Sequence, residues 1–218
     1  MAGYTECLTF ALMSKDDAIT KLGNDVKDSK HLDQFVQILK AKTQEFEVVR
    51  NSLIPGILKT IENNQKGSSS LPFKLFEISD VVFVDKKSDK VLINNKFETN
   101  ETGAYNKRHL CFAYVNHHSG FEVLQGVLDH LLENKIGLKW NDENDGYTIK
   151  PSNNKMFFPD RQAEIIINNK VVGIYGVVHP EVNKKFGKIL YPITICELYI
   201  EDVFNMILDK KLLNGKKQ

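Results

Sequence analysis

The sequence has few cysteines and no arrangement that would pair them. Cys7, Cys111 and Cys196 are far apart among the 218 residues, and no CxxC pair occurs. A zinc ribbon or a redox pair is therefore not indicated. An odd number of cysteines without a disulfide framework is typical of a reducing compartment. All three lie in apolar segments, where buried cysteines act as small hydrophobes more often than as nucleophiles.

Other absences narrow the function classes further. No apolar run approaches the roughly 18 residues of a membrane span, and the N-terminus lacks the basic and apolar regions of a secretory signal. We therefore expect a soluble, cytosolic chain, with Met1 and Ala2 preceding a segment of a longer protein. The formal net charge of +1 neither requires nor forbids nucleic acid. No GxSxG nucleophile motif is present.

What is present is a globular composition. Hydrophobic residues make up 42% and charged residues 26% of the sequence, which suffices for one folded core, or one core with a small satellite. We interpret residues 1–218 as a single domain. Residues 85–106 are rich in Lys, Asp, Asn, Glu and Thr, which predicts an exposed insertion.

The hydrophobic pattern predicts strands and helices that do not alternate regularly. Strands are expected over 7–12, 35–39, 72–85, 108–116, 147–150, 163–168, 171–178 and 193–200. Helices are expected over 15–22, 53–61, 119–132, 180–187 and 201–208, with 24–34 as a loop. Ser14 and Gly23 are expected to cap the first helix. Short polar connections favour a mostly antiparallel sheet flanked by helices, which is an α+β fold.

Two of these helices carry clear apolar stripes. The first stripe consists of Leu53, Ile54, Ile57, Leu58 and Ile61. The second consists of Phe121, Leu124, Val127, Leu128, Leu131 and Leu132. Each stripe is expected to pack against an apolar surface. The sequence Ser119-Gly-Phe-Glu122 has the pattern of a capping box at the start of the second helix.

The strand PFKLFEISDVVFVD (72–85) raises the question of whether its carboxylates are catalytic. It carries Glu77 and Asp80 among bulky apolar residues. Such carboxylates can form a general acid–base pair, or they can belong to the solvent face of a sheet.

Four other motifs allow a functional and a structural interpretation. His117-His118 could bind a metal, but the end of a solvated strand explains it more simply. Gly173 and Gly176 could form a phosphate loop or allow close packing. His179-Pro180-Glu181 could be an acid–base pair or the start of a helix. The turn 157–161 (FFPDR) could stack a ring or anchor a loop. From the residues alone, we predict no catalytic, cofactor or metal site.

Taken in chain order, several stretches resemble the C-terminal part of the phenylalanine–tRNA ligase beta subunit, of the eukaryotic and archaeal cytosolic kind. The most specific are RNSLIPGIL (50–58), LFEISDVVF (75–83) and VGIYGVVHPEV (172–182). GYTECLTFAL (3–12), KRHLCFAYVN (107–116), GFEVLQGVLDHLL (120–132) and FFPDRQAEI (157–165) add to them. The resemblance implies a fold like the class II aminoacyl-tRNA synthetase catalytic core.

The resemblance also bears on the carboxylate strand. In an active class II core, the equivalent strand ends in a Val-Phe-Arg-x-Glu-like pattern whose Arg grips the ATP α-phosphate. Here Val84 stands at the Arg position and Lys86 at the Glu position. A third signature, a Gly-rich strand running into a helix that presents another Arg, is expected to have no counterpart, because Gly173 and Gly176 lead to His179-Pro180. The resemblance thus implies a catalytically silent core in which Glu77 and Asp80 are scaffold residues.

The resemblance further implies a holoenzyme, an α2β2 tetramer that joins phenylalanine to tRNA with ATP and magnesium, while this chain binds no cofactor itself. Candidate contacts with the alpha subunit are Leu53, Ile54, Ile57, Leu58, Ile61, Phe121, Leu124, Leu128 and Leu131. For each of the two helices we favour the domain's own core slightly over an interface.

Two alternatives remain open. The first is a free-standing amino-acid-activating ligase, against which Val84 and Lys86 argue. The second is a tRNA-binding module that uses scattered basic residues: Lys86, Lys87, Lys90, Lys107, Arg108, Lys210, Lys211, Lys216 and Lys217.

Overall fold

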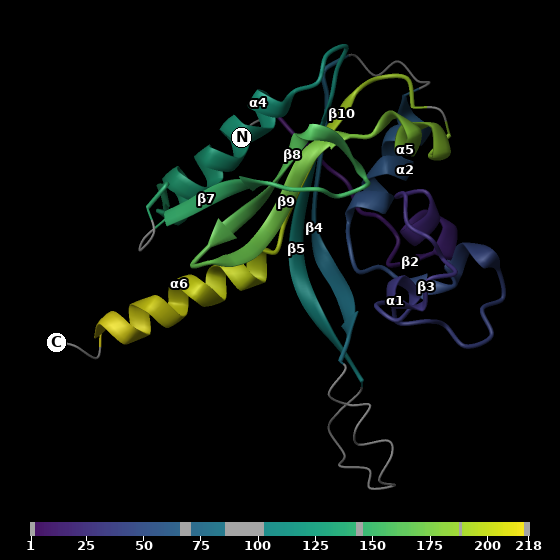
Figure 1. The fold of residues 1–218 in the computed structure, drawn as a ribbon, viewed down its shortest axis with the longest axis horizontal. Helices are drawn as coiled ribbons and strands as arrows, with labels where there is room; N and C mark the ends of the chain where they lie inside the picture. The colour runs from purple at the N-terminus through teal and green to yellow at the C-terminus, as the bar shows by residue number, and fades with distance from the viewer. Residues whose placement is uncertain (1–2, 66–70, 86–102, 143–145, 188, 216–218) are drawn as a thin grey trace, which may run out of the picture.

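A single large sheet organises the chain. The computed structural model describes residues 3–65, 71–85, 103–142, 146–187 and 189–215, and side chains as far as residue 208. Within these ranges, eight strands follow one another across the sheet (Figure 1). In order they are β1 (Thr5–Glu6), β4 (Phe73–Val84), β5 (Ala104–Val115), β10 (Ile193–Leu198), β9 (Lys170–Val178), β8 (Phe157–Ile167), β7 (Gly146–Pro151) and β6 (Lys139–Trp140). The two-residue edge strands β1 and β6 pair in parallel with their neighbours, and all other pairs are antiparallel.

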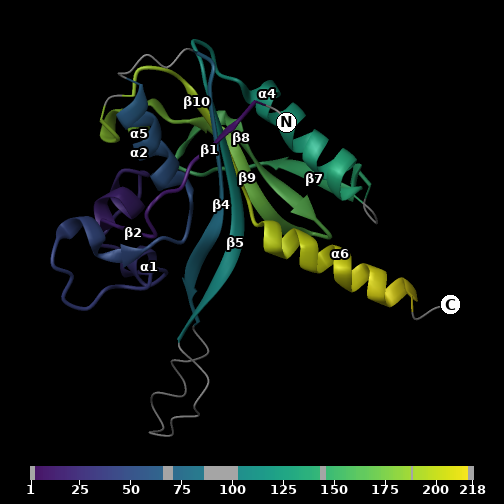
Figure 2. The ribbon, with the colours of Figure 1, turned by 180° about the vertical axis from the view of Figure 1, so that it is seen from behind.

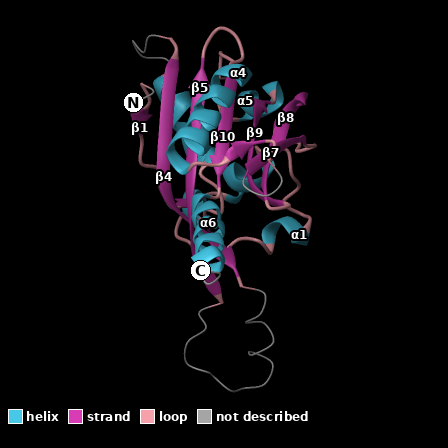
Figure 3. Cartoon of the chain, turned by 90° about the vertical axis from the view of Figure 1, so that its left-hand side faces the viewer, coloured by secondary structure: helices cyan, strands magenta, loops and turns pink. Residues whose placement is uncertain are grey.

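Helices cover both faces of the sheet. One face packs against α2 (Ile54–Asn64) and α5 (Pro180–Lys185). The other packs against α4 (Phe121–Asp129), which continues into a second helical segment (His130–Ile136), and against α6 (Ile200–Gly215). Figure 3 looks onto this second face, with α4 and α6 in front of the strands. The expected α+β fold with a mostly antiparallel sheet is confirmed.

A small lobe near the N-terminus has its own core. It contains the two-stranded sheet of β2 (Leu12–Met13) and β3 (Val48–Val49), the helix α1 (Ser29–Leu32), and the short helical segments Asp16–Thr20 and Gln44–Phe46. Met13, Ile19, Phe35 and Val48 are buried there. Figure 2 shows this lobe beside the lower part of β4. The lobe is the satellite that the composition allowed.

Elements with strong local signals form where the sequence predicts them. Pro55 occupies the first turn of α2, where its missing N–H leaves no hydrogen bond unmade. Ser14 accepts a hydrogen bond from the backbone N–H of Asp17, as expected of a cap. The hairpin of β8 and β9 turns at Asn168 and Asn169, whose φ angles of 50° and 61° are those of a type I′ turn.

Four local predictions are wrong. Residues 7–11 form no strand but an irregular segment between β1 and β2. The expected loop over 24–34 contains α1, and the expected strand over 35–39 makes only an isolated bridge at Gln37. Ser119 does not cap α4: the cap position belongs to Gly120, and the Ser119 hydroxyl accepts from Arg161 instead. Most of the predicted insertion, 86–102, lies outside the described residues.

Candidate functional site

Glu77 and Asp80 lie on opposite faces of the sheet. Odd-numbered residues of β4 such as Leu75 and Val81 belong to the core under α2, and Glu77 shares that face with none of its surface exposed. Asp80 points the other way, because successive strand residues alternate between faces. Its carboxylate pairs with Arg108 of β5 at 2.6 Å, on a surface where both side chains are about half exposed. The two carboxylates therefore cannot work as an acid–base pair.

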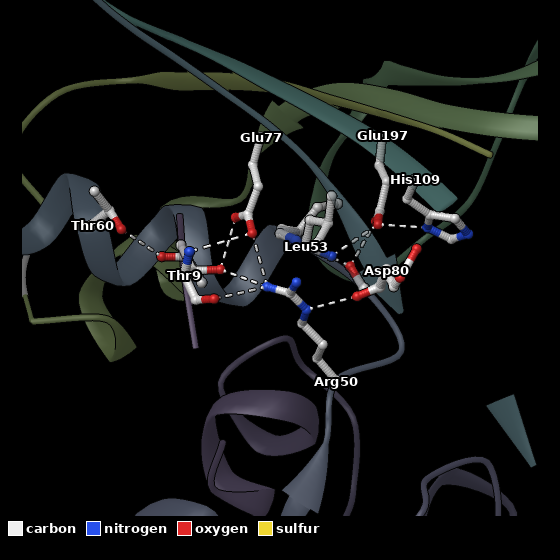
Figure 4. Close-up of polar contacts among 11 residues, drawn as sticks. Thr9, Arg50, Leu53, Thr60, Glu77, Asp80, His109 and Glu197 are labelled. Atoms are coloured by element: carbon white, nitrogen blue, oxygen red, sulfur yellow. Dashed lines mark hydrogen bonds and ion pairs between the residues drawn. The ribbon is translucent and has the colours of Figure 1, made fainter. Parts of the chain in front are cut away.

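Glu77 anchors three segments of the chain (Figure 4). Its Oε1 accepts from Nη1 of Arg50 at 2.9 Å, and its Oε2 accepts from the Thr9 hydroxyl at 2.8 Å. Arg50, just before α2, also donates from Nε to the carbonyl of Asp80 at 3.0 Å. A buried carboxylate requires such pairing, since an unpaired charge in the interior is strongly unfavourable. The network thus ties the N-terminal segment, the approach to α2, and β4 together.

Close packing on α2 supports this network. The Cα of Gly56 lies so near the Thr9 side chain that a Cβ at this position would overlap it. A glycine is therefore needed at position 56 for α2 to pass this close to Thr9, which binds Glu77.

Glu197 of β10 is a second fully buried carboxylate. Its Oε1 accepts from the backbone N–H of Leu53 at 2.8 Å, and its Oε2 accepts from the Ser52 hydroxyl at 2.6 Å. Glu197 therefore binds the amino end of α2, where the helix dipole favours negative charge. Nδ1 of His109 on β5 lies 2.9 Å from Glu197 Oε1, and the imidazole stacks on Tyr199 with ring centroids 4.6 Å apart. Nε2 of His109 has no hydrogen-bond partner among the described residues.

A cavity of about 490 Å³ adjoins this second network. Phe83, Tyr105 and Lys107 of the β4–β5 pair line it together with Glu197 and Asp202. This is the end of β4 at which an active class II core would carry its cation, and Val84 follows Phe83 there, paired with Ala104. The second substituted position, Lys86, lies outside the described residues.

The charges around the cavity do not fit a nucleoside triphosphate. Lys107 pairs with Asp202 at 2.7 Å and Lys170 approaches the same carboxylate at 3.5 Å. Burial alone would raise the pKa of Asp202, but the two lysines outweigh it and hold that pKa below its usual value. The lysines are thus committed to Asp202, and Glu197 adds a second carboxylate to the lining. Phosphates need uncommitted cations or N–H donors.

The glycines of β9 serve packing. A Cβ on Gly173 would lie 2.7 Å from the carbonyl oxygen of Glu197, and one on Gly176 would lie 2.9 Å from that of Arg161. A strand that runs directly into a helix occurs instead at β10 and α6, beside the cavity. That unit carries Glu197, Glu201 and Asp202, and its residues 193–215 include no Arg. Among the described strands, this junction of β10 and α6 also offers no Arg that could act as the cation of such a signature.

The side chains that we predicted as an alpha-subunit interface belong to the domain's own core. Leu53, Ile54, Ile57, Leu58 and Ile61 are essentially unexposed and pack under the sheet. Leu124 and Leu128 are buried on the other face, and the half-buried Phe121 and Leu131 pack against the same cluster. The seven buried side chains have no exposed area with which to contact a partner in this conformation, whereas Phe121 and Leu131 keep some exposed surface.

Exposed apolar residues occur instead on the segment that we predicted as a strand. Leu8 is 81% and Phe10 80% exposed, whereas Thr9 between them turns inward to Glu77. The Phe10 ring meets that of Phe46 edge to face, with centroids 6.2 Å apart. We call Leu8, Phe10 and Phe46 the N-terminal apolar patch. Sequence reasoning missed it because an apolar run suggests burial.

Two residues of the remaining motifs, His179 and Phe157, have structural roles. His179 caps α5, its Nδ1 accepting from the N–H of Glu181 at 3.1 Å. Phe157 is buried in the core under α2 and α5. Among the described residues, no group of three or more His, Cys, Asp or Glu side chains is arranged to hold a metal ion. Burial raises the pKa of the Cys111 and Cys196 thiols well above the ordinary value, which disfavours the reactive thiolate.

No helix in the described part of the chain is both long and apolar enough to cross a membrane.

Comparisons with known proteins point to one family. The family model described as "Phenylalanyl tRNA synthetase beta chain CLM domain" matches residues 1–200. The phenylalanine–tRNA ligase beta subunit of Mus musculus is 43% identical over 200 residues, which cover 92% of this chain and 31% of that protein. The human beta subunit is 44% identical over 185 residues, covering 85% and 28%, and the Arabidopsis thaliana beta subunit, named cytoplasmic, is 35% identical over 214 residues, covering 93% and 32%. The chain therefore spans less than a third of the length of these relatives.

A solved structure shows the same fold. The pyrrolysyl-tRNA synthetase of Desulfitobacterium hafniense superimposes with a TM-score of 0.66, covering 95% of this chain and 64% of that one. Its sequence is 12% identical, so the likeness concerns the fold alone. It confirms the expected class II synthetase-like core.

Proposed function

Since the chain belongs to the phenylalanyl-tRNA synthetase beta chain CLM domain family, we propose that it forms a catalytically silent class II core within a phenylalanine–tRNA ligase beta subunit. Its role is to build the contact with the catalytic alpha subunit. The assembly is an α2β2 tetramer in the cytoplasm that charges tRNA with phenylalanine, using ATP and magnesium bound outside this chain.

One observation carries the silent role, namely the chemistry of the cavity at the end of β4. A class II reaction needs cations that neutralise phosphate as a carboxylate attacks phosphorus. Val84 supplies none, and the lysines that line the cavity pair with Asp202. The carboxylate of Glu197 is held against the amino end of α2, which is a structural task.

The N-terminal apolar patch is the proposed contact with the alpha subunit. Leu8 and Phe10 expose large apolar side chains from a segment whose backbone is fixed by Thr9. A permanent subunit interface is more apolar than ordinary surface, and rigid exposed side chains lose little freedom on binding. This patch replaces the stripes of α2 and α4 as the candidate contact.

Association with the alpha subunit tests the proposal. The beta chain is coexpressed with its alpha subunit, and the mass of the complex is measured by light scattering. The wild type is expected to form the α2β2 complex, and the double variant Leu8→Ser/Phe10→Ser to weaken it at least about tenfold, as loss of interface anchors does. Val123→Ser, which removes an exposed apolar side chain from α4, is the matched control and is expected to leave the complex intact.

Catalysis is tested separately. The chain without its alpha subunit is expected to show no phenylalanine-dependent exchange of pyrophosphate into ATP. Measurable exchange would refute the silent role and favour the free-standing ligase, whereas a folded double variant that still assembles would refute only the contact surface.

A direct tRNA-binding role gains no support from the described basic residues. Lys107 and Arg108 pair with Asp202 and Asp80, so their charges are already compensated. The other basic residues of that alternative have no described side chains.

A further inference from the structure

Three motifs that the proposed function leaves unused meet around one hollow. His117 and His118 follow β5, Phe158 and Arg161 belong to β8, and Pro180 begins α5, yet all five line the same pocket of about 530 Å³. We call it the β8 pocket. It shares no residue with the N-terminal apolar patch.

A bulge in β8 shapes the rim of this pocket. The pairing with β9 shifts between Phe157 and Gln162, so the residues between them leave the ladder. Asp160 has a φ of 60°, a left-handed conformation that few residues other than glycine adopt. Bulges of this kind redirect side chains and often lie beside binding sites. As a result Phe158 is 41% exposed, with its ring stacked on that of His179.

The floor of the pocket is apolar. Val177, Val178 and Ile189 form it from β9 and from the segment before β10, and all three are buried. On the rim, Leu190 is 73% exposed. A large aliphatic side chain beside an apolar hollow is a common feature of protein-binding sites.

The polar lining is basic and contains no acid. The pocket lining includes His117, His118, Arg161 and Lys184 but no Asp or Glu. Lys184 pairs with Glu181 at 2.7 Å, outside the lining. Arg161 donates a hydrogen bond to the neutral Ser119 hydroxyl at 3.0 Å, and among the described residues it forms no ion pair with a carboxylate. An uncompensated guanidinium favours a carboxylate, which it can bind with two parallel hydrogen bonds.

We propose that the β8 pocket binds a short acidic and apolar segment of a partner protein. An aliphatic or aromatic side chain of that segment fills the hollow between Phe158 and Leu190, and a neighbouring Asp or Glu binds Arg161. This site goes beyond the proposed assembly with the alpha subunit.

The same features disfavour a nucleic acid. A single-stranded nucleic acid is held by several cations along a groove and by stacking on aromatic rings. The β8 pocket offers one uncompensated arginine. Of its rings, Phe158 already stacks on His179, and Tyr191 already packs edge to face against His117.

A random dodecapeptide display library selected on the beta chain, with counter-selection on the Arg161→Glu variant, tests the proposal. We expect enriched peptides that place Asp or Glu next to Leu, Ile or Phe. The best peptide is synthesised with a fluorescent label, and its affinity is measured by polarisation. Arg161→Glu and Leu190→Ser are each expected to weaken binding at least about tenfold. In NMR spectra, the peptide should shift the signals of residues 117–119 and 189–192.

Matched controls carry the same changes elsewhere. Lys150→Glu also replaces an exposed cation with an acid, and Val123→Ser removes an exposed apolar side chain; both should bind the peptide as the wild type does. The proposal is overturned if no acidic peptide is enriched, if Arg161→Glu binds equally well, or if labelled oligoadenylate binds in an Arg161-dependent manner where the peptide does not. The association of Arg161→Glu with the alpha subunit, measured by light scattering, should be unchanged, which separates this inference from the proposed assembly.

Discussion

Glu77 and Asp80 are three positions apart on one strand, but they lie in opposite environments. Glu77 is fully buried and shared by Arg50 and Thr9, whereas the side chain of Asp80 is 45% exposed and meets Arg108 in solvent. Both pairs have nearly ideal distances, so distance alone does not separate them. Burial separates them, because water screens the exposed pair and competes for it, whereas water does not reach the buried carboxylate to replace a lost partner. The same strand therefore carries one structural carboxylate and one surface carboxylate.

Asp202 on α6 lies between these extremes. Its side chain is 13% exposed, and it gathers Lys107 and Lys170 at the edge of the cavity. The three carboxylates form a graded series in which the effect of a substitution should follow burial.

The largest expected effect comes from breaking the buried pair. Arg50→Met leaves the Glu77 charge in the core with only Thr9 as a partner, which should lower the free energy of unfolding by about 3–5 kcal/mol. Chemical denaturation measures this loss. Arg108→Met makes the same change at the exposed pair and is the control. If Arg50→Met lost less than about 1 kcal/mol, burial would not decide how much an ion pair contributes to the free energy of unfolding.

The next largest effect tests the close approach that lets Thr9 reach Glu77. Gly56→Ala places a methyl group against the Thr9 side chain and should destabilise by about 1–3 kcal/mol, as overpacking does. Gly126→Ala in α4 is the control. A Cβ there meets no atom within 4 Å, so the better helix former should stabilise by about 0.5–1 kcal/mol. Equal melting temperatures of the two variants would contradict the packing at Gly56.

Asp202→Asn should have an intermediate effect that depends on pH. The lysines lower the folded-state pKa of Asp202 below its unfolded value near 3.8, so the stabilisation is complete above that value and is lost as the pH falls through the folded pKa. At neutral pH the variant should lose about 1 kcal/mol, the size expected for a partly screened pair. Urea denaturation should show the difference from the wild type shrinking below about pH 4. A difference that grows in acid would show that the pKa is raised instead.

The smallest effect is expected at the exposed pair. Asp80→Asn should change the free energy of unfolding by less than about 1 kcal/mol, and added salt should reduce the change further. Denaturation curves at low and high salt measure it. A salt-independent loss comparable to that of Arg50→Met would mean that Asp80 has a buried role.

The strongest local patterns could be read from the sequence. The stripe of α2 and the Asn168-Asn169 hairpin need only neighbouring residues, and both form as predicted. The strand predicted over 7–12 is wrong, because local reasoning could not foresee a distant contact. The Thr9 hydroxyl donates a hydrogen bond to Glu77, 68 positions away. With Thr9 turned inward, Leu8 and Phe10 point outward. Ser119 likewise fits a capping box, but Arg161 takes its hydroxyl.

The candidate site likewise has features that the sequence predicted and features that it could not predict. The missing cation at Val84 could be read from the resemblance to class II synthetases. The network around Glu197 could not, because Glu197 meets Leu53 and His109 across 144 and 88 positions of sequence. Three motifs also line the β8 pocket together, and this depends on the bulge in β8. No local sequence pattern predicts that bulge.

The sequence by itself determined the α+β pattern of strands and helices and the family. These are properties of residue identity and short-range periodicity. Only the tertiary structure decided which carboxylates are buried, that both apolar stripes serve the domain's own core, and that Leu8, Phe10 and Arg161 remain free at the surface. Exposure and charge pairing depend on which distant segments pack together, so residues next to each other in the chain can end in opposite environments.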